Sequence, residues 1–122
     1  MFLDVILEWA DKPFAYGADC CQFAGKMVEA KTGRNPMDVF SYGDEAMANE
    51  IIESHGGLRA AVIHTLGDPV SPDLAEDGDV LLLNCDKGPV VGSAYLGRAV
   101  VRTERGGLTD WPLAWATDCW KV

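Results

Sequence analysis

The spacing of hydrophobic residues changes at Gly78-Asp79, and this change constrains the fold more than any other feature of the sequence. Before this point, apolar residues recur every three or four positions, as in amphipathic helices. After it, short apolar runs are separated by glycine turns, beginning with the run at residues 80–83, as in buried antiparallel strands. We therefore predict a single α+β domain over residues 1–122, with N-terminal helices packed on a C-terminal antiparallel sheet.

The same patterns predict the individual elements. Trp9 is expected in the core. The segment after the third strand contains a proline and is expected to be irregular. Helices are predicted at residues 1–10, 19–32, 44–53 and 58–66, strands at 80–83, 90–95, 99–102 and 119–122, and irregular structure at 37–43 and 108–113.

The second predicted helix begins with an acidic residue followed by two cysteines. Asp19 is a good N-cap, and Gln22 stands three residues later, which is the spacing of a capping box. Cys20 then occupies the first helical position, where free backbone N–H groups and the helix dipole favour a thiolate. This environment prepares a cysteine nucleophile. Because free cysteines are also common as small buried residues, a purely structural role for Cys20 and Cys21 remains open.

The charge and cysteine usage exclude several classes of partner. The chain carries 19 acidic and 10 basic residues, for a formal charge of −9, and has no basic cluster to meet nucleic-acid phosphates or anionic lipids. No signal peptide or membrane-spanning run is recognisable, so we expect synthesis in a cytoplasm, reduced thiols and no membrane insertion. The four cysteines show no zinc-type spacing, so we expect neither a metal nor a cofactor.

Two of these motifs occur in the order found in a known class of enzymes. Asp19-Cys20 opens a helix, and Gly78-Asp79 begins the strands. The chain thereby resembles the NlpC-type cell-wall peptidases of the papain-like class. It is more closely similar to a small NlpC-related family of unknown function encoded in phage and prophage tail gene clusters. The features it shares are Pro13-Phe14, Tyr16-Gly17, Asp19-Cys20, Thr32-Gly33, Gly56-Gly57-Leu58, Gly78-Asp79-Val80, Gly107-Leu108 and Trp120-Lys121-Val122.

The sequence departs from the peptidases at the catalytic base. Where they have His-Val-Gly on a strand, this chain has Val90-Val91-Gly92, so Val90 is predicted to stand at the histidine position. Cysteine attack on an amide needs a base for the thiol and an acid for the leaving amine, and valine supplies neither. His55 and His64 are the remaining candidates for an unorthodox base.

Three hypotheses follow from the resemblance and its departure. The first is a non-catalytic structural or assembly component of a phage-type tail tip, made in the host cytoplasm and carried in the virion tail. Its partners are other tail or baseplate proteins, and the segment around Trp111 and Trp115 is the first candidate docking surface. Core packing of these tryptophans is the alternative, since large aromatic side chains are highly buried on average. The second is an active cysteine hydrolase that cleaves peptidoglycan peptides as the phage infects its host, and the third an unrelated domain with buried cysteines.

Overall fold

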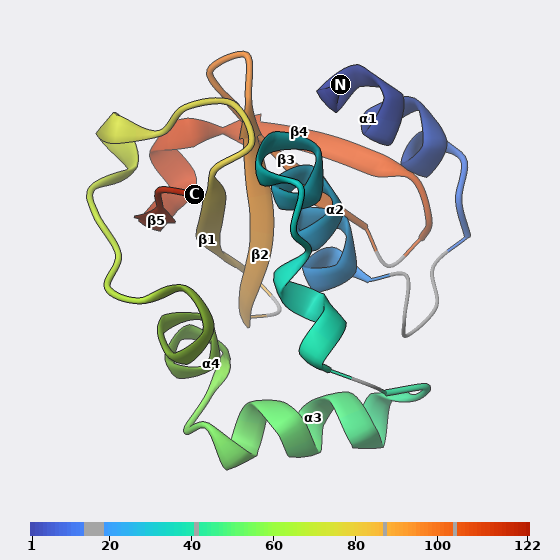
Figure 1. Ribbon diagram of the computed structural model, residues 1–122, viewed down its shortest axis with the longest axis vertical. Coiled ribbons are helices and arrows are strands. Elements are labelled where there is room, and N and C mark those ends of the chain that lie inside the picture. Colours follow the sequence, from blue (N-terminus) through green and yellow to red (C-terminus); the bar gives the residue numbers. More distant parts are fainter. Residues whose placement is uncertain (14–18, 41, 87, 104) are drawn as a thin grey trace.

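The computed structural model has four helices and one antiparallel sheet in the part of the chain that it describes, residues 1–13, 19–40, 42–86, 88–103 and 105–122 (Figure 1). The sheet has five strands in the order β4-β3-β2-β1-β5. The helices are α1 (Phe2–Ala10), α2 (Cys20–Thr32), α3 (Glu45–Ser54) and α4 (Leu58–Leu66), and the strands are β1 (Val80–Cys85), β2 (Gly88–Tyr95), β3 (Arg98–Arg102), β4 (Leu108–Pro112) and β5 (Ala116–Trp120). The predicted α+β class, with helices preceding the sheet, is confirmed.

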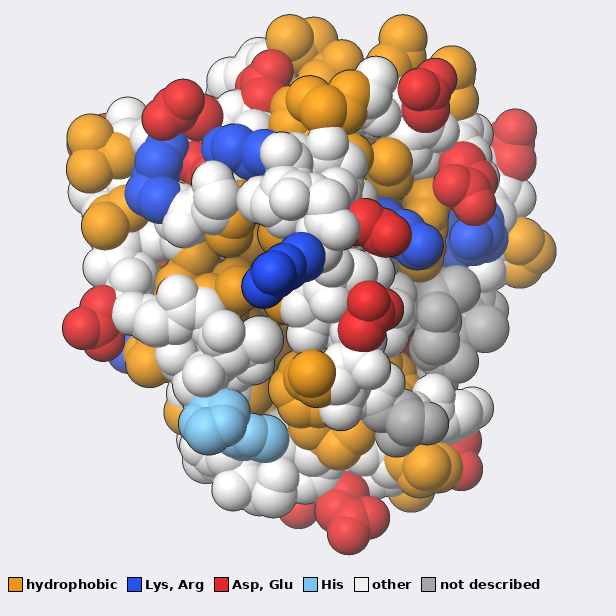
Figure 2. Space-filling model, in the orientation of Figure 1, with side chains coloured by type: hydrophobic (Ala, Val, Ile, Leu, Met, Phe, Trp, Pro, Cys, Tyr) orange, Lys and Arg blue, Asp and Glu red, His pale blue; other side chains and the backbone are white. Residues whose placement is uncertain are grey.

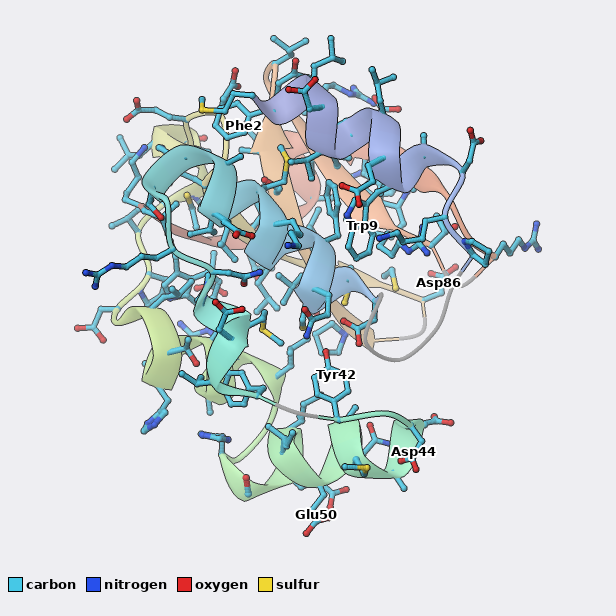
Figure 3. The ribbon with its side chains drawn as sticks, turned by 45° about the vertical axis from the view of Figure 1, so that its right-hand side comes forward. Phe2, Trp9, Tyr42, Asp44, Glu50 and Asp86 are labelled. Atoms are coloured by element: carbon cyan, nitrogen blue, oxygen red, sulfur yellow. The ribbon has the colours of Figure 1, made fainter. Side chains whose placement is uncertain are left out.

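Helix α2 packs across one face of the sheet and carries much of the core. Its Phe23 and Met27 are fully buried, and its neighbour Trp9 on α1 is only 2% exposed. The rings of Trp9 and Phe23 meet edge to face with centroids 5.7 Å apart, and Figure 3 shows Trp9 between the two helices. Burial of each such side chain stabilises the fold by about 1.5–3 kcal/mol, so α1 and α2 are held to the sheet as one layer.

The other face of the sheet is covered by its own C-terminal segments. Leu81 and Leu83 of β1 pack there with Val101 and Cys119, against half-buried Trp111. The prediction of irregular structure over residues 108–113 is therefore wrong, because residues 108–112 form β4 and pair with all of β3. The proline at its end is tolerated because β4 lies at the edge of the sheet.

Helix α4 packs Leu58, Val62, Ile63 and Leu66 against the edge of the core, and α3 lies outside it. In Figure 1 α3 crosses the bottom of the molecule, below the sheet. Its strongest packing is against α4, and α4 in turn contacts β2. Asp44 caps α3 by accepting a hydrogen bond from the Met47 N–H at 2.8 Å. The predicted irregular segment before α3 contains one short 3₁₀ turn, Pro36–Val39.

A buried carboxylate, Asp79, ties α2 and the C-terminus to the start of β1. Asp79 is 0% exposed, and its oxygens accept hydrogen bonds from Lys31 Nζ at 2.9 Å and from the N–H of Val122 at 3.1 Å. Lys121 forms a second ion pair with it, and the Glu76 N–H donates to it at 2.8 Å. Burial alone raises the pKa of a carboxyl group, but these donors outweigh that effect and hold the pKa of Asp79 below its usual value.

We expect Asp79→Ala to lower the free energy of unfolding by about 3 kcal/mol at neutral pH, as for other broken buried pairs. A lowered native-state pKa contributes stability that is present above the unfolded-state value, about 4, and is lost as the pH falls through the native-state value. The difference between wild type and variant should therefore shrink on acidification. Urea unfolding at several pH values measures this difference in the free energy of unfolding. Asp110→Ala, which removes an exposed ion pair with Arg98, is the matched control, and an equal loss in both variants would contradict the prediction.

Candidate functional site

The first turn of α2 presents Cys20 as predicted. The Asp19 carboxylate accepts hydrogen bonds from the N–H groups of Cys21 and Gln22, both at 3.1 Å, and Cys20 is the first residue of the helix. The Gln22 side chain does not complete the capping box as expected. It reaches the Tyr42 hydroxyl instead, with Nε2 at 3.5 Å from the oxygen. The helix start is thus fixed by Asp19, and Gln22 links it to the loop before α3.

The two adjacent thiols interact and differ in acidity. The Cys21 thiol donates a hydrogen bond to the Cys20 sulfur, which lowers the pKa of Cys20 although burial opposes the shift. The backbone N–H of Val91 adds a second hydrogen bond to the same sulfur. The pKa of Cys21 is raised well above its ordinary value by its hydrogen bond to Cys20 and by burial. These opposite shifts favour a thiolate at Cys20, with Cys21 as its hydrogen-bond donor.

Strand β2 brings an aliphatic side chain to this thiol. Val91 packs in the cluster that includes Cys20 and Cys21, on the face of the sheet that carries α2. Val90 packs in the cluster on the opposite face with Leu81 and Leu83. Because side chains alternate along a strand, the β2 residue that faces Cys20 is Val91, one position after the residue expected at the histidine position. Neither side chain can exchange a proton.

Cys20 opens onto a cavity of about 270 Å³ between the sheet and the outer helices. Most of its wall is apolar. Cys20 and Cys21 lie on its α2 side, and Val90 and Val91 on its β2 side. The residues that line it are Asp19, Cys20, Cys21, Ala24, Gly25, Pro36, Met37, Phe40, Tyr42, Ala48, Asn49, Ile51, Ile52, Leu58, Ala61, Val62, Thr65, Leu66, Val80, Pro89, Val90, Val91 and Arg102.

Four polar residues of the cavity lining were not predicted as site residues from the sequence: Tyr42, Asn49, Thr65 and Arg102. Tyr42 extends from the loop before α3 toward the start of α2 (Figure 3), and burial and a hydrogen bond to Asp19 raise its pKa. Arg102, buried at the end of β3, donates to the carbonyl oxygens of Trp9 at 3.1 Å and Gly107 at 3.2 Å. Its pKa is lowered by burial, an effect that the Asp19 charge opposes. Strand alternation is the one sequence signal that places Arg102 on the Cys20 face.

The two histidines lie together, away from the thiol. Their ring centroids are 4.8 Å apart, and both line a second hollow with Pro36, Val39 and Phe40. The histidines form a single pale blue patch at the lower left of Figure 2. Nδ1 of His55 is 2.8 Å from the Ile51 carbonyl oxygen, so this nitrogen carries the proton. Neither His55 nor His64 lines the cavity of Cys20.

The chain matches a family model over almost its whole length. The model describes a domain of unknown function (DUF6950), and the match covers residues 2–122. The chain belongs to the DUF6950 family. No curated protein matches it significantly.

Other kinds of site find little support in the described part of this DUF6950 domain. The residues that the structure describes contain no group of three or more His, Cys, Asp or Glu side chains able to hold a metal ion. None of the helices seen in this same part of the chain has the length and apolar character needed to cross a bilayer. Phe14, Tyr16 and Gly17, three of the residues behind the NlpC resemblance, lie outside the described residues.

We expect Cys21→Ala to raise the pKa of Cys20, because it removes a hydrogen-bond donor to the thiolate. The pH dependence of iodoacetamide labelling at Cys20, followed by mass spectrometry, measures this shift. In the native chain Cys20 should react at lower pH than Cys85 or Cys119. Cys85→Ala is the matched control and should leave the Cys20 profile unchanged. An unaltered midpoint in Cys21→Ala would show that Cys21 does not support the thiolate.

Proposed function

We propose that this DUF6950 chain is a structural or assembly component of a phage-type tail tip, built on a papain-like NlpC-type domain without peptidase chemistry. One observation carries the proposal: the strand that faces Cys20 offers Val91 in place of an imidazole. The nucleophile position is retained, while the residue that would make it catalytic toward an amide is not.

The arrangement of the elements supports the NlpC-type assignment. Cys20 opens a helix that packs its Phe23 and Met27 face on an antiparallel sheet. Asp79, from the Gly78-Asp79 motif, stands immediately before the first strand, and the strand that follows passes the thiol. This is the order of motifs on which the resemblance to the phage tail family rests.

The active-hydrolase alternative lacks an acid and a base at the thiol. A helix N-terminus and the Cys21 thiol help to form the thiolate, but a leaving amine must also be protonated. His55 and His64 lie in a different hollow, and the His55 Nδ1 is engaged by a backbone carbonyl. Tyr42, whose pKa is raised, is the nearest alternative acid, but its hydroxyl is hydrogen-bonded to Asp19.

The surface around Trp115 supports a docking role. Trp115 is 51% exposed, although large aromatic side chains are usually well buried. Its ring centroid is 5.5 Å from that of half-buried Trp111, and exposed Ala114 adjoins it in the chain. Tryptophans of this kind often lie at the centre of protein interfaces. We propose that this surface contacts a neighbouring tail or baseplate protein, burying about 1,200–2,000 Å² in total.

The native chain should show no measurable cleavage of peptidoglycan stem peptides, because general acid–base help worth about 10²–10⁴ in rate is absent. Chromatography of the incubated peptide with mass detection tests this.

Val91→His should lower the pH at which Cys20 is alkylated, since an imidazolium beside a thiolate stabilises it. Val90→His is the matched comparison and should lower this pH less, because Val90 packs with Leu81 and Leu83 on the opposite face of the sheet although it also borders the cavity. Peptide cleavage by the native chain that Cys20→Ser abolishes would establish the hydrolase, and His55→Ala and His64→Ala would then identify its base.

Trp115→Ala should reduce incorporation of the protein into tails by about tenfold or more, the effect of losing an interface hot spot of about 1.4–2 kcal/mol. Tail particles assembled from the co-expressed tail gene cluster, purified and quantified by mass spectrometry, provide the measurement. Leu96→Ala is the matched control, because Leu96 is also exposed but lies in the β2–β3 turn. Cys20→Ser should be incorporated normally. Complete tails that contain none of this protein would refute the assembly role.

A further inference from the structure

The cavity beside Cys20 is large for a domain of this size and is built to hold an apolar group. At about 270 Å³ it exceeds the cavity of about 150 Å³ that binds benzene in another protein. Aliphatic side chains from all sides, including Ile52, Leu58, Val62 and Leu66, form most of its wall. The polar residues of the lining are Asp19, Tyr42, Asn49, Thr65 and Arg102. The aliphatic part of the wall is a poor site for ordered water, which needs two or more polar partners. Its chemistry favours a hydrocarbon occupant.

A nucleophile lies on the wall of this cavity. Cys20 is the first residue of α2 and packs in the same cluster as Cys21 and Val91. Hydrogen bonding with the Cys21 thiol and with the Val91 backbone lowers the pKa of Cys20. Both cysteines and Val91 belong to the cavity lining. The occupant can therefore reach Cys20, a thiol whose pKa is lowered.

Because the described lining of the cavity lacks an imidazole, Cys20 can attack only substrates whose leaving group needs no protonation. An amide expels an amine, which must be protonated as it leaves, and no imidazole lines the cavity. A thioester expels a thiolate, whose conjugate acid has a pKa near 8.5 and which leaves without prior protonation. A thiol–thioester exchange needs only the nucleophile that the site provides.

We propose that Cys20 accepts an acyl group from a thioester donor and holds it as an S-acyl cysteine, with the hydrocarbon chain inside the cavity. The Cys20 thiolate attacks the thioester carbonyl, a new carbon–sulfur bond forms, and the donor's carbon–sulfur bond breaks. The electron pair leaves with the donor's sulfur, and no oxidant or reductant is needed. Because no imidazole is present to activate water, the acyl group persists.

This inference goes beyond the assembly role and does not depend on it. A filled cavity would brace α3 and α4 against the sheet, since residues of all three line it. The assembly role is tested by incorporation into tails, whereas acyl transfer is tested on the purified chain, so the two can fail separately.

The first experiment incubates the purified chain with octanoyl-coenzyme A and follows its intact mass. We expect one octanoyl group per chain, located at Cys20 by peptide mapping and removed by neutral hydroxylamine. Cys20→Ser should abolish this adduct, while Cys85→Ser should leave it unchanged. Labelling should be at least about tenfold faster at Cys20 than at Cys85, as expected for a thiol with a lowered pKa. No adduct, or equal labelling of both thiols, would overturn the proposal.

The second experiment tests whether the cavity binds the hydrocarbon part of the acyl group. Octanoyl-coenzyme A should label Cys20 about tenfold faster than acetyl-coenzyme A, because only the longer chain gains apolar burial. Ala61→Leu narrows the cavity and should reduce this preference, whereas Ala46→Leu on the exposed side of α3 should not. In the wild-type chain, free octanoate should protect Cys20 from iodoacetamide, a measurement that needs no variant. Equal rates for both donors, or protection without acyl transfer, would overturn the proposal.

Discussion

The buried carboxylate of Asp79 holds together parts of the chain that are far apart in sequence. A charge of this kind is tolerated in a core only if it is paired and hydrogen-bonded. Lys31 brings α2 to it, and Lys121 and the Val122 N–H bring the C-terminus. Because α2 is anchored at its C-terminal end by this pair, its N-terminal end is positioned against β2. The geometry of the thiol site depends on that placement.

The described part of the site at the start of α2 favours a reactive thiolate but lacks the acid and base that amide hydrolysis requires. Asp19 caps the helix, and Cys21 and the Val91 N–H stabilise a thiolate at Cys20. The same strand that supplies the N–H also presents an aliphatic side chain to the sulfur. Cys20 can thus lose its proton, but Val91 cannot donate a proton to the amine that leaves when an amide is cleaved. Among possible substrates, this asymmetry favours those with good leaving groups over peptides.

The cavity lies where α3 and α4 meet the sheet and α2. Helix α3 packs chiefly on α4, and the space between them and the sheet is not closed by large side chains. Ala48 and Ala61, the buried residues of these two helices, are both small. The apolar lining and the thiol are therefore parts of one structural feature. A domain under selection only for compactness would fill such a space, since interiors are otherwise close-packed.

The sequence alone determined the features that depend on local patterns. Helical spacing and capping placed Cys20 in the first turn of α2, and the change in periodicity at Gly78-Asp79 placed the sheet after the helices. The tertiary structure alone decided that residues 108–112 form a strand, because that segment is stabilised by pairing with β3. It also decided that Val91 and not Val90 faces the thiol, since a one-residue difference in register exchanges the faces of a strand. The cavity and the place of Tyr42 in it arise from packing between distant segments, which no local pattern encodes.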